Sequence, residues 1–154
     1  MTGCMNRGNH EGENGVGVYY YEAASGMVDE KIFLASEESG ELLQEDVEGL
    51  AYISEDGSTF SVLINGTVYQ VDLNSRTYQE VITGVARNCH ASSRSGRYFA
   101  WLPEGEEYGS SEMTVMDMEQ GTTRQVTAGS DEDIRPVCYM DEDLVCGTAK
   151  KSDV

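Results

Sequence analysis

The stretch Ser93 to Thr127, SRSGRYFAWLPEGEEYGSSEMTVMDMEQGTTRQVT, decides the fold that this sequence predicts. A polar turn leads into the apolar run Tyr98 to Leu102, and an acidic loop separates it from a second run that ends at Met118. A turn at Glu119 to Gly121 and a short closing run complete the unit. Short runs of aromatic and β-branched residues between turn residues are typical of antiparallel strands.

The same unit occurs more than once. Thr67 to Val81 aligns without gaps on Glu112 to Val126, and the turn Ser54 to Gly57 matches the turn Ser93 to Gly96. A looser copy lies upstream, and a new copy begins at Pro136. A repeat of about 40 residues with four short strands is the period of a propeller blade. A single twisted sheet cannot bury both of its faces, so such blades stack on one another.

Local patterns place the other strands. Asn65-Gly66 between apolar runs is the pair that a type I′ hairpin turn favours, and Asp56-Gly57 is a second turn signal. Asp72 and Asp117 occupy equivalent places in two copies, where we expect them to cap turns through backbone hydrogen bonds. Upstream of Gly84 the strands are predicted at Val16 to Glu22, Lys31 to Ala35, Glu41 to Asp46, Leu50 to Ile53, Thr59 to Ile64, Thr67 to Leu73 and Tyr78 to Ile82.

These patterns predict an all-β fold, a partial β-propeller of about three to four four-stranded antiparallel blades. We expect a flexible N-terminal tether over residues 1–15 and blades over residues 16–154. The blade boundaries are predicted near 16–47, 50–83, 88–127 and, incomplete, 136–154. Closed propellers have four to eight blades, so the chain has the pattern of a fragment with open strand edges. We expect this piece alone to be marginally stable or to self-associate.

The blade pattern resembles TolB-like (WD40-like PD40) repeats. The likeness is carried by Ser54-Glu55-Asp56-Gly57, by Val71-Asp72-Leu73 and by the closing Gln125-Val126-Thr127. The sequence departs from the family pattern because the turn has no proline and because Ile53 or Ser92 stands where the family has tryptophan. The resemblance implies a propeller. It leaves the function open, because such repeats occur in periplasmic translocation proteins, in secreted binding proteins and in the propellers of prolyl-oligopeptidase-like enzymes.

The composition is strongly acidic, with 28 Asp and Glu against 10 Lys and Arg and a formal net charge of −18. Nucleic-acid binding is disfavoured because phosphate neutralisation needs clustered basic residues, and a basic membrane-docking surface is disfavoured for the same reason. The charge permits a cationic partner, although solubility alone explains it as well. No apolar run is long enough to cross a membrane.

The N-terminus Met1-Thr2-Gly3-Cys4 resembles the end of a bacterial lipoprotein signal, in which the cysteine becomes lipidated. The polar, Gly-rich stretch from Asn6 to Gly15 would then be a tether. The alternative is an ordinary disordered start with a chance cysteine. A lipid on Cys4 would be the only contact with a membrane.

Three further cysteines, Cys89, Cys138 and Cys146, imply no complete disulfide framework. Cys138 and Cys146 are predicted on neighbouring strands of one hairpin, close enough to pair. The alternative is that they are buried free thiols, because free cysteine is among the most buried residue types.

The search for chemistry finds no catalytic residues, metal site or cofactor. There is no Gly-x-Ser-x-Gly nucleophile motif, and acidic clusters such as Asp131 to Asp133 lack the spacing of a calcium loop. His90 is predicted on the innermost strand of its blade, where it could face a ligand or serve as a hydrogen-bonded structural residue. The loop that varies between copies supplies the other candidates for ligand or partner binding: Glu104, Glu106, Glu107 and Tyr108.

The sequence therefore favours a non-catalytic, extracytoplasmic propeller module that binds a protein or small ligand at the bacterial cell surface. The alternative is the N-terminal propeller of a prolyl-oligopeptidase-like serine hydrolase whose catalytic domain is not in this chain. Additional blades beyond Val154 would favour the first reading, and an α/β domain with a nucleophile motif would favour the second.

Overall fold

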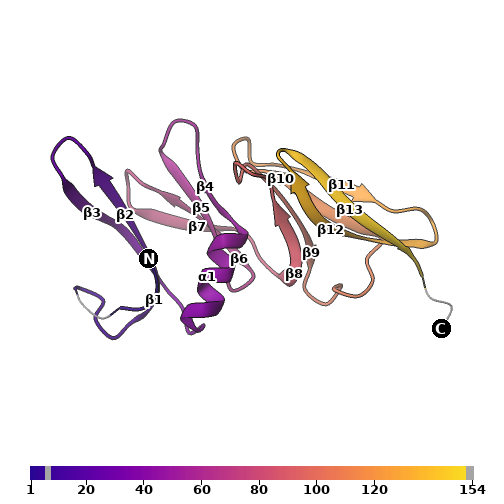
Figure 1. Ribbon diagram of the computed structural model, residues 1–154, viewed down its shortest axis with the longest axis horizontal. Helices are drawn as coiled ribbons and strands as arrows, with labels where there is room; N and C mark the ends of the chain where they lie inside the picture. The colour runs from indigo at the N-terminus through magenta and orange to yellow at the C-terminus, as the bar shows by residue number, and fades with distance from the viewer. Residues whose placement is uncertain (6–7, 152–154) are drawn as a thin grey trace.

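The computed structural model describes residues 1–5 and 8–151, and Figure 1 shows its sheets following one another in chain order along the long axis. Two predicted segments fall partly outside these residues: the tether at 6–7 and the last repeat at 152–154. The elements are β1 (Thr2–Cys4), β2 (Asn14–Glu22), β3 (Met27–Ala35), α1 (Gly40–Gly49), β4 (Ala51–Ile53), β5 (Thr59–Ile64), β6 (Thr67–Asp72), β7 (Thr77–Ile82), β8 (Val85–Ser92), β9 (Tyr98–Pro103), β10 (Glu112–Asp117), β11 (Thr122–Thr127), β12 (Glu132–Met140) and β13 (Asp143–Lys150).

Every sheet is an antiparallel meander of strands consecutive in the chain. Strands β4–β7 form one four-stranded sheet and β8–β11 form a second. A three-stranded sheet, β1–β3, precedes them, and a two-stranded sheet, β12–β13, follows. The predicted all-β fold with four-stranded antiparallel blades is confirmed, and the arrangement is that of a partial β-propeller.

The sheets stack because their central strands are apolar on both faces. Successive side chains of a strand point to opposite faces. In β5, Leu63 joins the layer between the two four-stranded sheets, whereas Val62 and Ile64 join the layer toward β2, β3 and α1. In β9, Phe99 faces the first of these layers and Leu102 faces the layer toward β12. Each four-stranded sheet is therefore covered on both sides.

The predicted turns are confirmed. Asn65 and Gly66 both have positive φ, 46° and 69°, as a type I′ turn requires. The Asp72 carboxylate accepts hydrogen bonds from the next turn's backbone N–H groups at 2.8 and 2.9 Å. Asp117 accepts the equivalent bonds at 3.0 and 3.2 Å. Arg97 also donates two hydrogen bonds to the Asp117 carboxylate, and these donors lower the pKa of Asp117.

The prediction of a strand at Glu41 to Asp46 is wrong, because this segment lies in helix α1. Ser39 caps the helix: its side chain accepts a hydrogen bond from the backbone N–H of Leu42 at 3.4 Å. Leu43 and Asp46, three residues apart, are both buried on one face of the helix. The segment is also rich in Glu, Leu and Gln, which are good helix formers. Helix propensity and the three-residue spacing of the buried positions together outweigh the short apolar run that suggested a strand. No helix in the described ranges is long and apolar enough to span a bilayer.

The N-terminal residues do not behave as the predicted tether. Thr2–Cys4 pair with β2, and the amino group of Met1 donates a hydrogen bond to the carbonyl oxygen of Gly17 at 3.0 Å. Met5 is buried. Backbone pairing and burial therefore hold this segment against β2, although its sequence has no strand periodicity.

The cysteines are free thiols. Cys138 and Cys146 lie on the neighbouring strands β12 and β13, as predicted, with Cys138 opposite Val145 and Cys146 opposite Pro136. The expectation that they are buried is wrong, because both are exposed on a hairpin whose outer side carries no further sheet in the described chain. Cys89 is buried, as expected.

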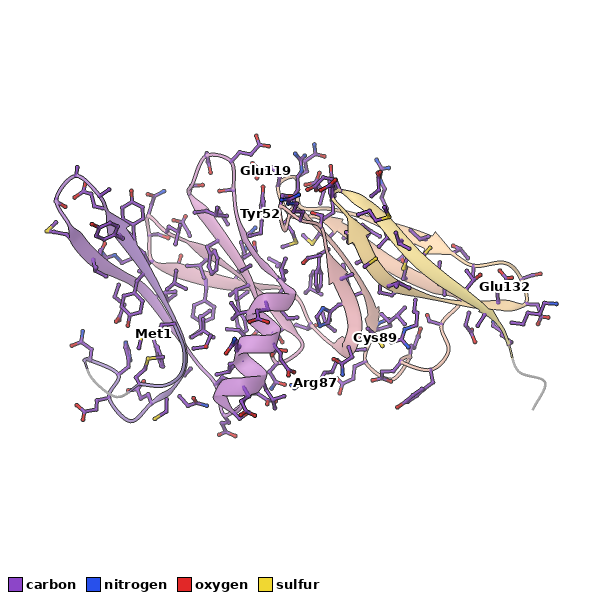
Figure 2. The ribbon with its side chains drawn as sticks, in the orientation of Figure 1. Met1, Tyr52, Arg87, Cys89, Glu119 and Glu132 are labelled. Atoms are coloured by element: carbon purple, nitrogen blue, oxygen red, sulfur yellow. The ribbon has the colours of Figure 1, made fainter. Side chains whose placement is uncertain are left out.

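Carboxylates join the turns of neighbouring sheets at one end of the stack. Glu119 accepts hydrogen bonds from the Tyr52 hydroxyl and from the backbone N–H of Glu55, and Figure 2 shows Tyr52 and Glu119 meeting between the two sheets. Burial of the phenol, together with this carboxylate, raises the pKa of Tyr52 to about 12. Glu142 accepts similar bonds from the backbone and hydroxyl of Ser95 one sheet further on.

The layer between the two four-stranded sheets should carry much of the stability. Phe99 has 0% exposure in this layer, so Phe99→Ala should lower the free energy of unfolding by about 3–5 kcal/mol, because the cavity it leaves can only partly collapse. Urea denaturation measures this loss. Tyr21→Ala, at an exposed position of β2, is the control and should cost less than about 1 kcal/mol. Equal losses in the two variants would contradict the stacked-layer account.

Candidate functional site

Three of the residues predicted from the sequence, His90, Glu104 and Glu107, line one cavity of about 150 Å³. The cavity lies where α1, the β5–β6 hairpin, β8 and the loop after β9 meet. The helix, the hairpin and β8 supply the remaining lining residues: Asp46, Leu63, Asn65, Gly66, Val85 and Arg87. Ligand pockets for drug-sized molecules measure about 300–1,000 Å³, so this cavity has room only for a small group.

His90 is held in place by packing. Its ring lies 5.7 Å from the Phe99 ring, centroid to centroid. On another side it contacts Gly49 at the end of α1, where a Cβ atom would come within 2.7 Å of the imidazole Cε1. A larger residue at position 49 would therefore force the His90 ring to move. The imidazole makes no hydrogen bond within the described residues, which leaves its nitrogen atoms free for a group in the cavity.

Burial lowers the pKa of His90 below its usual value of 6.5. The Asp46 carboxylate opposes this effect and raises the pKa, whereas the positive charge of Arg87 lowers it further. Since desolvation is the largest of these causes, the neutral imidazole prevails at pH 7. A neutral imidazole can donate one hydrogen bond and accept another.

Asp46 and Arg87 are site residues that sequence reasoning missed. Asp46 is 6% exposed, and its Oδ2 atom accepts a hydrogen bond of 2.6 Å from the backbone N–H of Asn65, which fixes the carboxylate against the hairpin turn. Arg87, labelled in Figure 2, lies on β8. Its Nη2 atom is 3.3 Å from a carboxylate oxygen of Glu38. Recognising the helix cap at Ser39 would have placed Asp46 on the buried face of α1.

The acidic loop divides between two places. Glu104 and Glu107 face the cavity, but Glu106 turns back to accept a hydrogen bond from the Ser110 hydroxyl. Tyr108 is 100% exposed and borders a second hollow beside β12 and β13, which Glu107 also lines. The four loop residues predicted as one site therefore do not form one, and only two of them join His90.

The cavity has an excess of negative charge. Three carboxylates line it, and the guanidinium that lines it is already paired with Glu38. Its lining residues include no serine, cysteine or lysine that could act as a nucleophile. The described residues contain no group of three or more His, Cys, Asp or Glu side chains placed to hold a metal ion. What the arrangement can do is accept a cationic or hydrogen-bonding group.

The chain matches no protein-family model and no curated protein sequence. Among solved structures it is similar to dipeptidyl peptidase 4 from Porphyromonas gingivalis, with 14% identity over 94% of this chain and 26% of that one and a TM-score of 0.44. It is also similar to the tricorn protease, with 16% identity over 84% of this chain and 14% of that one and a TM-score of 0.40. A third similar structure is a protein assigned as TolB from Agrobacterium tumefaciens, with 20% identity over 66% of this chain and 42% of that one and a TM-score of 0.35.

The chain spans less than half the length of each of these three proteins. Similarity at this level carries no information about function, so the basis for a function is the chemistry of the cavity.

The two histidines should titrate on opposite sides of pH 6.5. Burial lowers the pKa of His90, whereas the hydrogen bond to Glu13 raises that of His10, and NMR of the imidazole protons can follow both. Asp46→Asn should lower the pKa of His90 further, because it removes the opposing charge.

The unfolded state binds more protons than the folded state between the folded His90 pKa and 6.5. The stability that comes from keeping His90 neutral is therefore lost as the pH falls through this window. A His90 pKa above that of His10 would contradict this environment.

Proposed function

We propose that this chain is a non-catalytic, extracytoplasmic binding module that takes the cationic end of its ligand into the cavity beside His90. The observation that supports this most directly is the meeting of Asp46, Glu104 and Glu107 around one small cavity with a single, already paired, positive charge. A lysine side chain or a small amine has the matching charge and size. The lining has no serine, cysteine or lysine, which is in keeping with a non-catalytic role.

The charge of the whole chain acts in the same direction. A net charge of −18 produces a negative potential that attracts cations and raises their rate of encounter. Of the three carboxylates only Asp46 is buried, so its charge acts in a lower dielectric than the charges of the more exposed Glu104 and Glu107. His90 adds a hydrogen-bonding group, and because its imidazole is neutral at pH 7 it does not repel the cation.

The test uses acetyl-lysine-methylamide as the probe and acetyl-norleucine-methylamide as its uncharged counterpart. Isothermal titration calorimetry should detect the lysine probe and not the norleucine probe. The double variant Glu104→Gln/Glu107→Gln keeps the side-chain shape and should weaken binding at least about tenfold, or about 1.4 kcal/mol.

The matched control, Glu80→Gln/Glu112→Gln, removes the same charge from exposed positions on β7 and β10. It should leave the affinity within about twofold. Equal weakening by both double variants would show that the net charge, and not the cavity, attracts the probe, and equal binding of the norleucine probe would refute the cationic ligand.

We further propose that a lipid on Cys4 holds the module at the bacterial cell surface; its thiol is exposed. Lipidation would follow removal of Met1, Thr2 and Gly3, of which Thr2 and Gly3 pair with Val16 and Gly15. The anchored form would therefore lose the Thr2 and Gly3 pairs of β1 and keep only the pairing of Cys4 with Asn14. Mass spectrometry of the native protein should find Cys4 at the N-terminus with its lipid, and an unmodified Cys4 behind an intact Met1 would refute the anchor.

A further inference from the structure

The cavity beside His90 holds a buried negative charge without a partner cation. Asp46 is 6% exposed, and its carboxylate forms no salt bridge within the described residues. Its one hydrogen bond there comes from an uncharged group, the backbone N–H of Asn65. Burying a carboxylate costs free energy unless a cation or several donors offset the loss of water. Asp46 therefore favours any positive charge that enters the cavity.

An irregularity in β8 brings two side chains to this cavity that a regular strand would separate. Arg87 and His90 are three residues apart, and side chains at that spacing point to opposite faces of a regular strand. The register of β8 against β9 shifts between Val85 and His90, and Asn88 within this segment has a φ of 60°. Arg135 on β12 holds the segment by donating a hydrogen bond of 3.1 Å to the carbonyl oxygen of Asn88. Such bulges redirect side chains toward functional sites.

Three of the elements packed around the imidazole present charged side chains to it. These side chains are Asp46 from α1, Arg87 from β8, and Glu104 and Glu107 from the loop after β9. The β5–β6 hairpin and β9 contribute Leu63, Asn65 and Phe99 at this place, none of which titrates. Histidine is the side chain whose charge ordinarily changes near neutral pH. His90 is therefore the group through which mild acidification can alter the charge of the cavity.

We propose that protonation of His90 releases the bound cation, because the imidazolium neutralises the charge of Asp46 and repels the positive charge of the ligand. This inference rests on the proposed function, since it concerns the same cavity and the same class of ligand. Only one proton moves: the imidazole takes it from water as the pH falls and returns it as the cation binds. Two positive charges in a cavity of about 150 Å³ lie close together, where salt screens their repulsion only weakly.

Packing keeps the positive charge in the cavity after protonation. The His90 ring lies against Phe99 on one side and against Gly49 on another. The coupling is reciprocal: protonation weakens cation binding by the same factor by which a bound cation weakens proton binding. Burial already lowers the pKa of His90 below 6.5 in the free chain, so release should occur in mildly acidic and not in neutral solution.

NMR titration of the unaltered chain, with and without saturating acetyl-lysine-methylamide, tests this coupling directly. The probe should lower the pKa of His90, with proton binding weakened at least about tenfold. The pKa of His10 serves as the control and should stay where it is, because that ring stacks on Phe33 and hydrogen bonds to Glu13 and Glu30. A His90 pKa that the probe leaves unchanged, or lowers no more than that of His10, would overturn the proposal.

Calorimetry between about pH 8 and about pH 5 measures the same coupling from the side of the ligand. The affinity for the lysine probe should fall below the His90 pKa, approaching about tenfold per pH unit. His90→Gln should lose most of this decline, whereas His10→Gln should keep it.

The outcomes separate this inference from the proposed function. An equal decline in the two histidine variants would assign the pH dependence to other groups and overturn the inference. Binding whose strength does not depend on pH would refute the inference alone. No binding at about pH 8, where histidine is ordinarily neutral, would refute the proposed function and this inference with it.

Discussion

The structure depends on strands that are apolar on both faces. A sheet with one apolar face could be satisfied by a single partner layer, but β5 and β9 bury alternate residues in different layers. Each four-stranded sheet must therefore be covered twice, and the sheets stack in chain order as a consequence. Phe99, with no exposed surface, lies in the layer where the two complete sheets meet.

Stacking also creates the cavity. His90 is on β8, the first strand of its sheet, and the neighbouring layer brings the β5–β6 hairpin and α1 against it. The helix ends at Gly49, and the lack of a side chain there lets the backbone approach the imidazole. A Cβ at position 49 would come within 2.7 Å of the imidazole, so the ring could not keep its present place against the helix. The site is thus a by-product of how two layers fit together, and its chemistry comes from residues on both.

The distribution of polar groups separates stability from recognition. Carboxylates at turns, such as Asp72 and Asp117, are occupied by backbone N–H groups and serve the fold. Glu119 similarly joins one sheet to the next. Around the cavity, Asp46 accepts a hydrogen bond from the backbone of Asn65 and Glu107 accepts one from the backbone of Gly105, and a carboxylate with one such donor can still accept others. A strongly acidic composition therefore conceals two populations of carboxylates that only their surroundings distinguish.

The sequence by itself determined the strand and turn pattern, because turn chemistry acts over a few residues: Asn65-Gly66 and the caps at Asp72 and Asp117 could be predicted locally. It failed at Glu41 to Asp46, where a serine cap and helical spacing competed with an apolar run, and at the first residues, where backbone pairing needs no periodicity. It identified His90, Glu104 and Glu107 singly. Only the tertiary structure decided that they share a cavity with Asp46 and Arg87 while Glu106 and Tyr108 do not, because the cavity forms where segments distant in the chain pack together.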